Sequence, residues 1–319
     1  MRFENYLTGY LQFLAMKNHA QGTINWHKAY LKQCFTYLEE RGTDDPKAVT
    51  REQIEAYRVY LKTEHRTKRG GALADSTYES HIAAITGFFH WLEQTKQILM
   101  TPVMKPERPK KSKPLKLPEV MTEEEAVKVL EATPINTPTG LRDRAILEVL
   151  YSTGIRRSEL INLNLEDLFI ERGEIAIKQG KGKKDRIVPV GEVALLFLMA
   201  YLKLIRPWLA QAPDETALFL TTGGHRMSQG ALKIMIGRAA QKSGVQRRIT
   251  PHIFRHSMAT HLLRNGADIR HIQALLGHAS LLSTQVYTHL TIEDLKQAVK
   301  KAHPRAKREA KKAGSEPNQ

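Results

Sequence analysis

The sequence predicts a mainly α-helical protein with one small antiparallel β-sheet, organised as two domains. Apolar side chains recur at helical spacing through residues 1–100. A basic segment with five prolines, residues 101–118, then interrupts this periodicity and is typical of an extended interdomain linker. Beyond it, residues 119–306 are again mainly helical in pattern, except for two alternating segments typical of a β-hairpin. We therefore expect an all-helical domain followed by an α+β domain.

The first domain, residues 1–100, is expected to be a bundle of four helices. The second helix should run from about Thr23 to Arg41, where Gly42 ends it. Thr50-Arg51-Glu52-Gln53 and Ser76-Thr77-Tyr78-Glu79 have capping-box spacing and should open the third and fourth helices. The apolar stripes that would face the core are Phe3, Tyr6, Leu7, Tyr10, Leu11 and Leu14, then Ile54, Tyr57 and Leu61, then Tyr78, Ile82, Ile85, Phe89 and Leu92.

The second domain should begin with a capped helix. Thr122-Glu123-Glu124-Glu125 has capping-box spacing, and its three carboxylates suit the positive end of a helix better than a metal site. Another helix is expected over about Leu141–Thr153, ending at Gly154.

A β-hairpin with a basic tip is predicted next. Glu174–Lys178 and Arg186–Val190 alternate with period two, and Gly180–Asp185 between them is rich in glycine and lysine. From Val193 onward the pattern is mainly helical. The last helix, Ile292–Ala302, carries one apolar stripe, formed by Leu295, Val299 and Ala302, that could be buried within its own chain or on a neighbouring one.

Charge points to an anionic partner. The chain has 49 Lys+Arg against 33 Asp+Glu, a net charge of +16. Residues 101–118 contribute +5 and residues 301–319 contribute +4, which is more than half of the excess. The charge of the linker has two explanations: it serves solvation alone, or the linker crosses a polyanion and releases its counterions. In the second case the contacts would come from Lys110, Lys111 and Lys113, with Lys183 and Lys184 on the hairpin tip.

Other classes of protein are disfavoured. The longest apolar run, Val193–Leu202, is about half a membrane span, and no signal peptide is visible after Met1. Cys34 is the single cysteine, which excludes an intramolecular disulfide and a multi-cysteine zinc site. We expect a soluble, cytoplasmic protein.

Five short features could carry phosphoryl-transfer chemistry together. Paired arginines can bind phosphate oxygens and neutralise the charge that grows in a pentacoordinate transition state. Histidine and lysine can move protons, and a tyrosine can attack phosphorus. The features are Thr153–Leu160 with Arg156, the hairpin residue Lys181, His252–His256 with Arg255, Leu276-Gly277-His278, and Tyr287. A metal site at the histidine pair is disfavoured, because the intervening residues Ile-Phe-Arg lack the general-base glutamate of a zinc-protease helix and the charge of Arg255 would oppose a cation.

These motifs resemble one family in combination. TGIRRSEL (153–160), HIFRH (252–256), LGH (276–278) and VYTH (286–289) are similar to the arginine, HxxRH, histidine and nucleophile motifs of the tyrosine recombinases, the phage-integrase family. The resemblance covers Thr122 to about Ala306 closely and extends to the N-terminal bundle, which looks like the family's core-binding domain. It is closest to the Xer branch, on Arg142–Leu160, GKGKKDRIVPV and His303–Ala306.

The resemblance implies a role for each matching residue. Tyr287 would attack a DNA phosphodiester to give a 3′-phosphotyrosine and a free 5′-hydroxyl. Arg156 and Arg255 would bind the scissile phosphate, and Lys181 would be the general acid for the 5′-oxygen.

The remaining family positions imply supporting roles. His252 would accept a proton or donate to the phosphate, and His278 would complete the phosphate site. Glu159 resembles the family's accessory acid, and we expect it to orient Arg156 or His252. His256 and His289 flank these motifs and are expected to be structural.

The resemblance also implies the partners. We expect a C-shaped clamp on double-stranded DNA with an inverted-repeat core site, and four protomers, identical or paired with a paralogue, on two such sites in the nucleoid. A DNA translocase or a directionality factor could assist, and the chemistry needs no metal or nucleotide cofactor. Residues 307–319 are expected to be a disordered basic tail.

Several functions remain open. Within the recombinases, the use could be chromosome-dimer resolution, integration and excision of a mobile element, or plasmid or transposon resolution. A type IB topoisomerase shares the tyrosine chemistry, and a DNA-binding protein could keep the fold without activity. The N-terminal bundle and the Xer-like ending disfavour the topoisomerase. The presence of Tyr287 disfavours a protein that only binds DNA.

Overall fold

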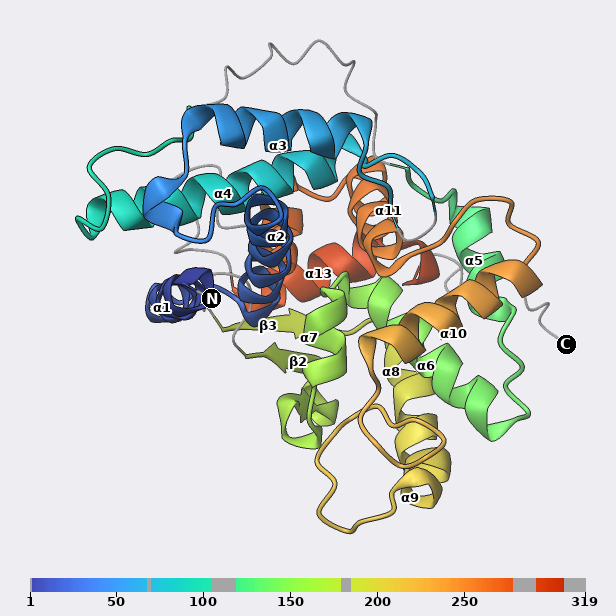
Figure 1. Cartoon of the computed structure of the whole chain (residues 1–319). Coiled ribbons are helices and arrows are strands. Elements are labelled where there is room, and N and C mark those ends of the chain that lie inside the picture. Colours follow the sequence, from blue (N-terminus) through green and yellow to red (C-terminus); the bar gives the residue numbers. More distant parts are fainter. Residues whose placement is uncertain (1, 68–69, 105–118, 179–184, 278–290, 307–319) are drawn as a thin grey trace, which may run out of the picture. The chain divides into compact units, whose positions relative to one another are not determined.

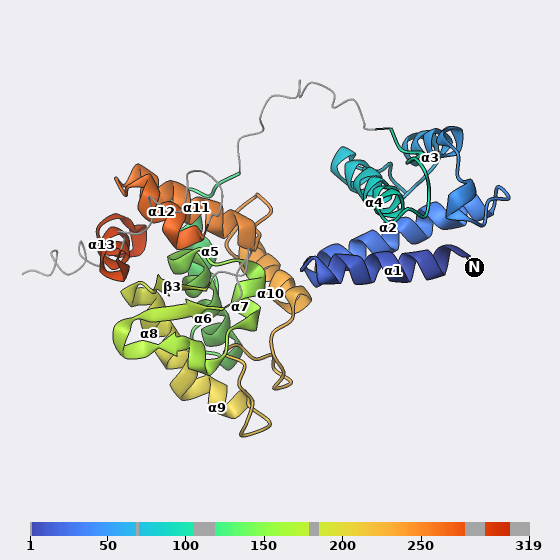
Figure 2. The same ribbon diagram turned by 90° about the vertical axis from the view of Figure 1, so that its left-hand side faces the viewer.

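The computed structural model describes residues 2–67, 70–104, 119–178, 185–277 and 291–306. The contacts divide the chain into two compact units, within residues 1–114 and 115–319. The first unit contains α1–α4 and the second the remaining helices and the sheet (Figures 1 and 2). No helix among the described residues is long and apolar enough to cross a membrane.

The N-terminal unit is a bundle of four helices. Its elements are α1 (Arg2–Met16), α2 (Gln21–Glu39), a 3₁₀ turn (Pro46–Ala48), α3 (Arg51–Thr63) and α4 (Asp75–Gln94). The predicted stripes supply much of a core rich in aromatic rings, in which Phe3 stacks on Phe35, and Phe88 packs against both Phe35 and Tyr10.

The two capping predictions in this unit have different outcomes. Thr50 and Gln53 form the predicted capping box at the start of α3, with both reciprocal hydrogen bonds present. The prediction for the fourth helix is wrong, because α4 begins at Asp75, so that Ser76 already lies in its first turn. The N-cap residue, Ala74, offers no side-chain acceptor, and the Asp75 carboxylate instead places negative charge at the positive end of the helix.

The C-terminal unit is built around a buried helix, α6 (Pro138–Thr153). From Arg144 to Thr153 every residue of α6 is buried, so other elements cover this helix on all sides. The other helices are α5 (Glu123–Glu131), α7 (Arg157–Asn162), α8 (Glu192–Ala200), α9 (Arg206–Leu209), α10 (Gln229–Lys242), α11 (Pro251–Arg264), α12 (Ile269–Leu276) and α13 (Ile292–Ala302). A π-helical turn (Tyr201–Ile205) joins α8 to α9, and 3₁₀ turns lie at Leu165–Asp167 and Ile170–Arg172.

Local sequence signals fix the ends of α5 and α6. The capping box predicted at Thr122 and Glu125 is present at the start of α5. Gly154 ends α6 with φ of +59°, in the left-handed region. The left-handed conformation favours glycine here, and a Cβ on Gly154 would also lie 2.0 Å from Cε of Met258, so that this methionine side chain would have to move.

The sheet confirms the predicted hairpin and adds a strand. β2 (Glu174–Ile177) pairs antiparallel with β3 (Arg186–Pro189), and Ile177 lies opposite Arg186 at the end nearest the hairpin tip. A two-residue strand, β1 (Leu168–Phe169), which we did not predict, pairs with the other edge of β2. Ile175 and Val188 are buried and join the sheet to the core.

The last helix, α13, packs within its own chain. Leu295, Val299 and Ala302, the stripe predicted from the sequence, are buried against β3, α11 and α12. Lys296 of α13 binds the buried Glu174 of β2 at 2.8 Å. The stripe is therefore buried within its own chain, the first of the two arrangements that the sequence allowed.

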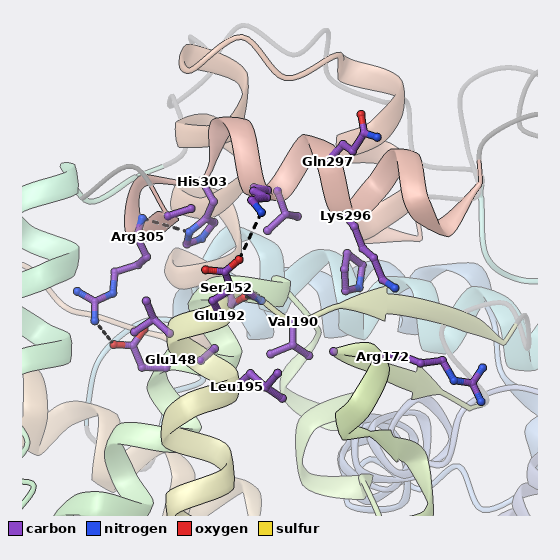
Figure 3. A pocket seen from close by; sticks show the side chains of 18 of the residues that line it. Glu148, Ser152, Arg172, Val190, Glu192, Leu195, Lys296, Gln297, His303 and Arg305 are labelled. Atoms are coloured by element: carbon purple, nitrogen blue, oxygen red, sulfur yellow. Dashed lines mark hydrogen bonds and ion pairs between the residues drawn. The ribbon is translucent and has the colours of Figure 1, made fainter. Parts of the chain in front are cut away.

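The residues after α13 attach to α6. Arg305 donates to the buried carboxylate of Glu148 (Figure 3). The same carboxylate also accepts from Arg144. His303 contacts the carbonyl oxygen of Tyr151 through Nε2, at 3.1 Å, while its Nδ1 accepts from the backbone N–H of Arg305. The ring therefore needs the neutral form that carries its proton on Nε2. A cavity of about 360 Å³ lies beside these residues, lined in part by Ser152 and Lys296.

Burial lowers the pKa of His303 to about 4. The unfolded chain protonates the His303 ring more readily than the folded protein does. The contribution of the neutral ring to the free energy of unfolding is therefore complete above pH of about 6.5 and is lost as the pH falls toward about 4. In the unaltered protein, His303 should therefore make the free energy of unfolding fall by up to about 3 kcal/mol between these two pH values. In His303→Gln this part of the fall should be absent. Thermal unfolding of both proteins between these pH values checks this, and equal pH dependence in the two would contradict it.

Candidate active site

Arg156 and Glu159 are brought together by the start of α7. Arg156 is the N-cap residue of this helix, and Glu159 is its third residue. A glutamate at this position reaches back to the N-cap backbone, and here Oε2 of Glu159 accepts from the Arg156 N–H at 2.8 Å. Oε1 accepts from Nη1 of the Arg156 side chain, also at 2.8 Å. One carboxylate thus fixes both the backbone and the guanidinium of Arg156.

Arg255 lies on α11 and joins two helix ends. Thr250 caps α11 and Pro251 is its first residue, which fixes where the helix starts and therefore where Arg255 points. Nη1 of Arg255 donates to the carbonyl oxygen of Gly154 at 2.6 Å, and Nη2 donates to that of Leu276 at 2.7 Å. These oxygens belong to the C-terminal ends of α6 and α12, where a positive charge is favoured.

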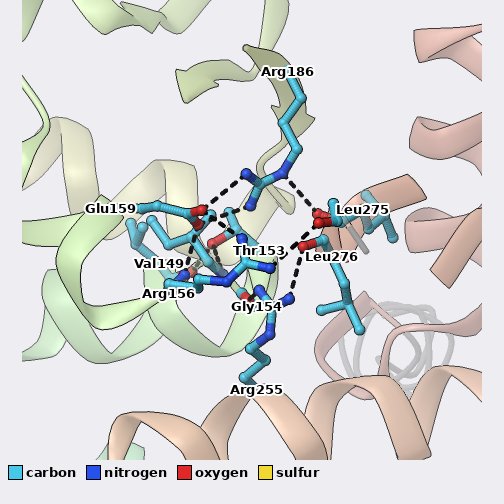
Figure 4. A network of polar contacts seen from close by, with 11 residues as sticks. Val149, Thr153, Gly154, Arg156, Glu159, Arg186, Arg255, Leu275 and Leu276 are labelled. Carbon is cyan, nitrogen blue, oxygen red and sulfur yellow. Dashed lines mark hydrogen bonds and ion pairs between the residues drawn. The ribbon is translucent and has the colours of Figure 1, made fainter. Parts of the chain in front are cut away.

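A third arginine, Arg186, completes the cluster. It is the first residue of β3, and its Nη1 and Nη2 donate to the two oxygens of Glu159 at 3.0 and 2.8 Å (Figure 4). Its Nε donates to the carbonyl oxygen of Leu275 at 3.2 Å. We did not single out Arg186 from the sequence.

The three arginines converge on the C-terminal end of α12. Arg186 donates to Leu275, Arg255 to Leu276, and Arg156 to Gly277 at 3.3 Å, so that three consecutive carbonyl oxygens each accept from a different arginine. The last carbonyls of a helix lack partners within the helix and carry partial negative charge. Side chains far apart in the sequence are therefore held together by one helix end (Figure 4).

The cluster carries more positive than negative charge. Among the described residues, its hydrogen bonds and ion pairs join three guanidinium groups with one carboxylate, a formal net charge of +2. Burial raises the pKa of Glu159, but the bonds from Arg186 and Arg156 outweigh this and lower it to about 2, so the carboxylate stays ionised. Burial and the charge of Arg156 lower the pKa of Arg255 to about 10. A nearby anion would relieve this repulsion.

The guanidinium groups keep donors for such an anion. The hydrogen bonds of Arg156 and Arg255 within the described part of the chain use two of the five N–H groups on each side chain. The geometry therefore suits a phosphate group, to which arginine donates two parallel hydrogen bonds.

The two histidines of the HIFRH motif lie at the surface of α11. His252 and His256 are both exposed, while Arg255 between them is buried. Burial, His252 and Arg255 lower the pKa of His256. The hydrogen bonds of Glu159 go to Arg156 and Arg186, so of the two targets expected for this acid, the structure shows Arg156. No group of three or more His, Cys, Asp or Glu side chains in the described residues could hold a metal ion.

Most of the other predicted site residues fall in segments that the structure does not describe. The catalytic candidates Lys181, His278 and Tyr287, and the DNA-binding candidates Lys110, Lys111, Lys113, Lys183 and Lys184, lie outside the described residues. Their roles stay predictions.

Comparison with known proteins decides the family. A model of the phage integrase family matches residues 119–294, and one of the phage integrase N-terminal SAM-like domain matches residues 7–96. The chain belongs to the phage integrase family of tyrosine recombinases. The chain is 37% identical over 301 residues to tyrosine recombinase XerD of Listeria monocytogenes serotype 4b (strain F2365), covering 93% of this chain and 98% of the relative. It is 38% identical over 309 residues to tyrosine recombinase XerC of Pelotomaculum thermopropionicum (strain DSM 13744 / JCM 10971 / SI), covering 95% and 99%. It is therefore a tyrosine-type site-specific DNA recombinase.

Solved structures agree with the family. The XerH site-specific recombinase, in a post-cleavage complex with its palindromic difH substrate, is 25% identical with a TM-score of 0.66, covering 89% of this chain and 81% of that one. Residues 75–356 of λ integrase, solved as a dimer bound to a core site, share the fold at 20% identity with a TM-score of 0.63. The match covers 92% of this chain and 100% of that one.

Glu159 should be important for the stability of this recombinase. Glu159→Gln leaves two neighbouring arginines without their counter-ion, and we expect it to lower the free energy of unfolding of the C-terminal unit by about 3 kcal/mol. Glu166→Gln is the matched control, since Glu166 pairs with Lys178 at the exposed surface, and should cost less than about 1 kcal/mol. Protection of α6 amides against hydrogen exchange in urea measures both. Equal effects would show that the ion pairs of Glu159 do not stabilise the unit.

Proposed function

We propose that this recombinase cuts and rejoins duplex DNA by transesterification, through a 3′-phosphotyrosine at Tyr287. The observation that carries the proposal is the cluster of Arg156, Arg186 and Arg255 around the single carboxylate of Glu159, with its excess of positive charge. A scissile phosphodiester is an anion that suits such a site, and the charge on its oxygens grows in the transition state. Membership of the family supports Tyr287 as the nucleophile.

Each chemical step of strand cleavage is then assigned to particular side chains. Arg156 and Arg255 bind the non-bridging phosphate oxygens with the N–H groups that the protein leaves available. The Tyr287 oxygen attacks phosphorus, forming the new P–O bond, while the bond from phosphorus to the 5′-oxygen breaks. His252 accepts the tyrosine proton, or it donates to the phosphate and the tyrosine proton passes to water. His278 donates to the phosphate as well, and Lys181 gives a proton to the departing 5′-oxygen. Attack by a second 5′-hydroxyl reverses these steps and rejoins the strand.

We also propose the assembly in which this happens. Solved relatives include a λ integrase tetramer bound to a Holliday junction, and this supports four protomers acting on two duplexes with inverted-repeat core sites. Lys110, Lys111 and Lys113 of the linker, with Lys183 and Lys184, would add sequence-independent contacts to phosphates. Affinity for DNA should therefore fall steeply with salt. The similarity to XerC and XerD supports an Xer-type use in chromosome-dimer resolution, with integration or excision of a mobile element as the other use.

The covalent intermediate tests the proposal. A duplex that the protein binds is first selected from a randomised pool. It is then resynthesised with a nick close to the scissile phosphate. Cleavage releases the short fragment that carries the 5′-hydroxyl, and because this fragment diffuses away the strand cannot be rejoined. The protein should form a covalent adduct on a denaturing gel, whereas Tyr287→Phe should bind the same duplex and form none, because the nucleophilic oxygen is missing. The control Tyr60→Phe, in the N-terminal unit, should form the adduct normally.

Two outcomes would contradict the proposal. One is an adduct formed by Tyr287→Phe, and the other is the absence of an adduct from the unaltered protein on DNA that it binds. Exchange of strands between two labelled duplexes, compared with relaxation of a single supercoiled circle, separates recombination from a topoisomerase-like activity.

A further inference from the structure

Arg186 connects three segments that are distant in the sequence. It starts β3, binds both oxygens of Glu159 on α7, and donates to the carbonyl oxygen of Leu275 at the end of α12. Its side chain is only 13% exposed. Three of its five N–H groups are used in these contacts, so it is held more fully than Arg156 or Arg255.

Arg186 and Arg156 share one carboxylate. Oε1 of Glu159 accepts from Nη1 of both arginines, at 2.8 Å from Arg156 and 3.0 Å from Arg186. Oε2 accepts from the Arg156 backbone and from Nη2 of Arg186, both at 2.8 Å. The bidentate bond from Arg186 therefore fixes the plane of the carboxylate against which the Arg156 guanidinium is aligned.

The shared carboxylate also sets the charge that a phosphate would meet. If Glu159 bound only Arg156, its charge would neutralise that guanidinium. With Arg186 on the same carboxylate, one negative charge is divided between two positive charges, and the cluster with Arg255 stays at a formal +2. Removing Arg186 would lower this to +1 and weaken the attraction for phosphate.

Arg186 fits closely against the end of α12. Gly277, which follows this helix, has φ of +62°. A Cβ built on Gly277 would lie 3.0 Å from both Cδ and Nε of Arg186. The absence of a side chain at this position lets the stem of Arg186 approach the backbone that Arg156 also binds, through the Gly277 carbonyl.

We propose that Arg186 is a positioning residue for the phosphate-binding arginines. It acts through Glu159 and through the end of α12: it aligns Arg156 and keeps the site positively charged, without itself binding the phosphate. This inference rests on the proposed function, because it assigns Arg186 a part in binding the scissile phosphate during cleavage.

The charge of the phosphate provides the test. On the selected nicked duplex, single-turnover formation of the adduct is measured at saturating DNA for the unaltered protein and for Arg186→Met. We expect Arg186→Met to be slower by about 10–100-fold, as for residues that orient the ligands of a reactive centre. A second duplex carries a methylphosphonate at the scissile position, which removes the negative charge. On this methylphosphonate duplex, the rate of adduct formation by Arg186→Met should be closer to that of the unaltered protein, because the neutral group needs less stabilisation from cations.

Matched variants separate positioning from folding. Arg206→Met removes a buried arginine that donates to the carbonyl oxygen of Ala217 in the same unit, away from Glu159. Arg206→Met should lower the rate of adduct formation only as far as it lowers the fraction of folded protein, and by the same factor on both duplexes. Arg186→Lys keeps the charge but cannot bind both oxygens of Glu159 together with Leu275, so it should show a smaller deficit than Arg186→Met, and it serves if the methionine variant fails to fold.

The outcomes decide between the proposals. Normal cleavage by Arg186→Met, an equal loss on both duplexes, or a loss confined to DNA affinity would overturn the role of Arg186 and leave the proposed function intact. If the unaltered protein forms no adduct on the phosphodiester, the proposed function fails and the inference fails with it.

Discussion

The C-terminal unit depends on one carboxylate, that of Glu159, held between two arginines. It accepts from the backbone and side chain of Arg156 and from both terminal nitrogens of Arg186. Without it, the partners of these three guanidinium groups among the described residues would be carbonyl oxygens, which offset less of their charge. With it, two of the guanidinium groups have a counter-ion and the cluster still has a formal net positive charge, which favours the binding of an anion.

Helix ends supply the rest of the framework. Arg255 spans the C-terminal ends of α6 and α12, and each of the last three carbonyls of α12, up to Gly277, accepts from a different arginine. The same arginines that would bind the scissile phosphate therefore fix the end of the helix that precedes His278. If these arginines bind the scissile phosphate as proposed, phosphate binding and the position of this helix end would be linked through the shared side chains.

Much of this could be predicted from the sequence, where the signals are local. The capping boxes at Thr50 and Thr122 and the hairpin are confirmed, because each depends on residues only a few positions apart. The box at Ser76 was wrong, since the same spacing also fits inside the first turn of a helix. The contacts of Arg186 could not be predicted, because its partners lie 27 and 89 positions away and only the tertiary fold selects them. From the alternation of apolar residues, Arg186 was predicted only to be the first residue of a strand that follows a basic hairpin tip.

We propose that Glu159 acts on catalysis by aligning Arg156, and a double-mutant cycle on DNA cleavage can show whether it does. Single-turnover adduct formation at saturating DNA is measured for the unaltered protein, Glu159→Gln, Arg156→Lys and the double variant. If the carboxylate works by aligning Arg156, the two losses overlap, and Glu159→Gln costs little more once Arg156→Lys is present. If the two rate losses instead multiply in full, Glu159 and Arg156 act independently, and Glu159 does not work by aligning Arg156.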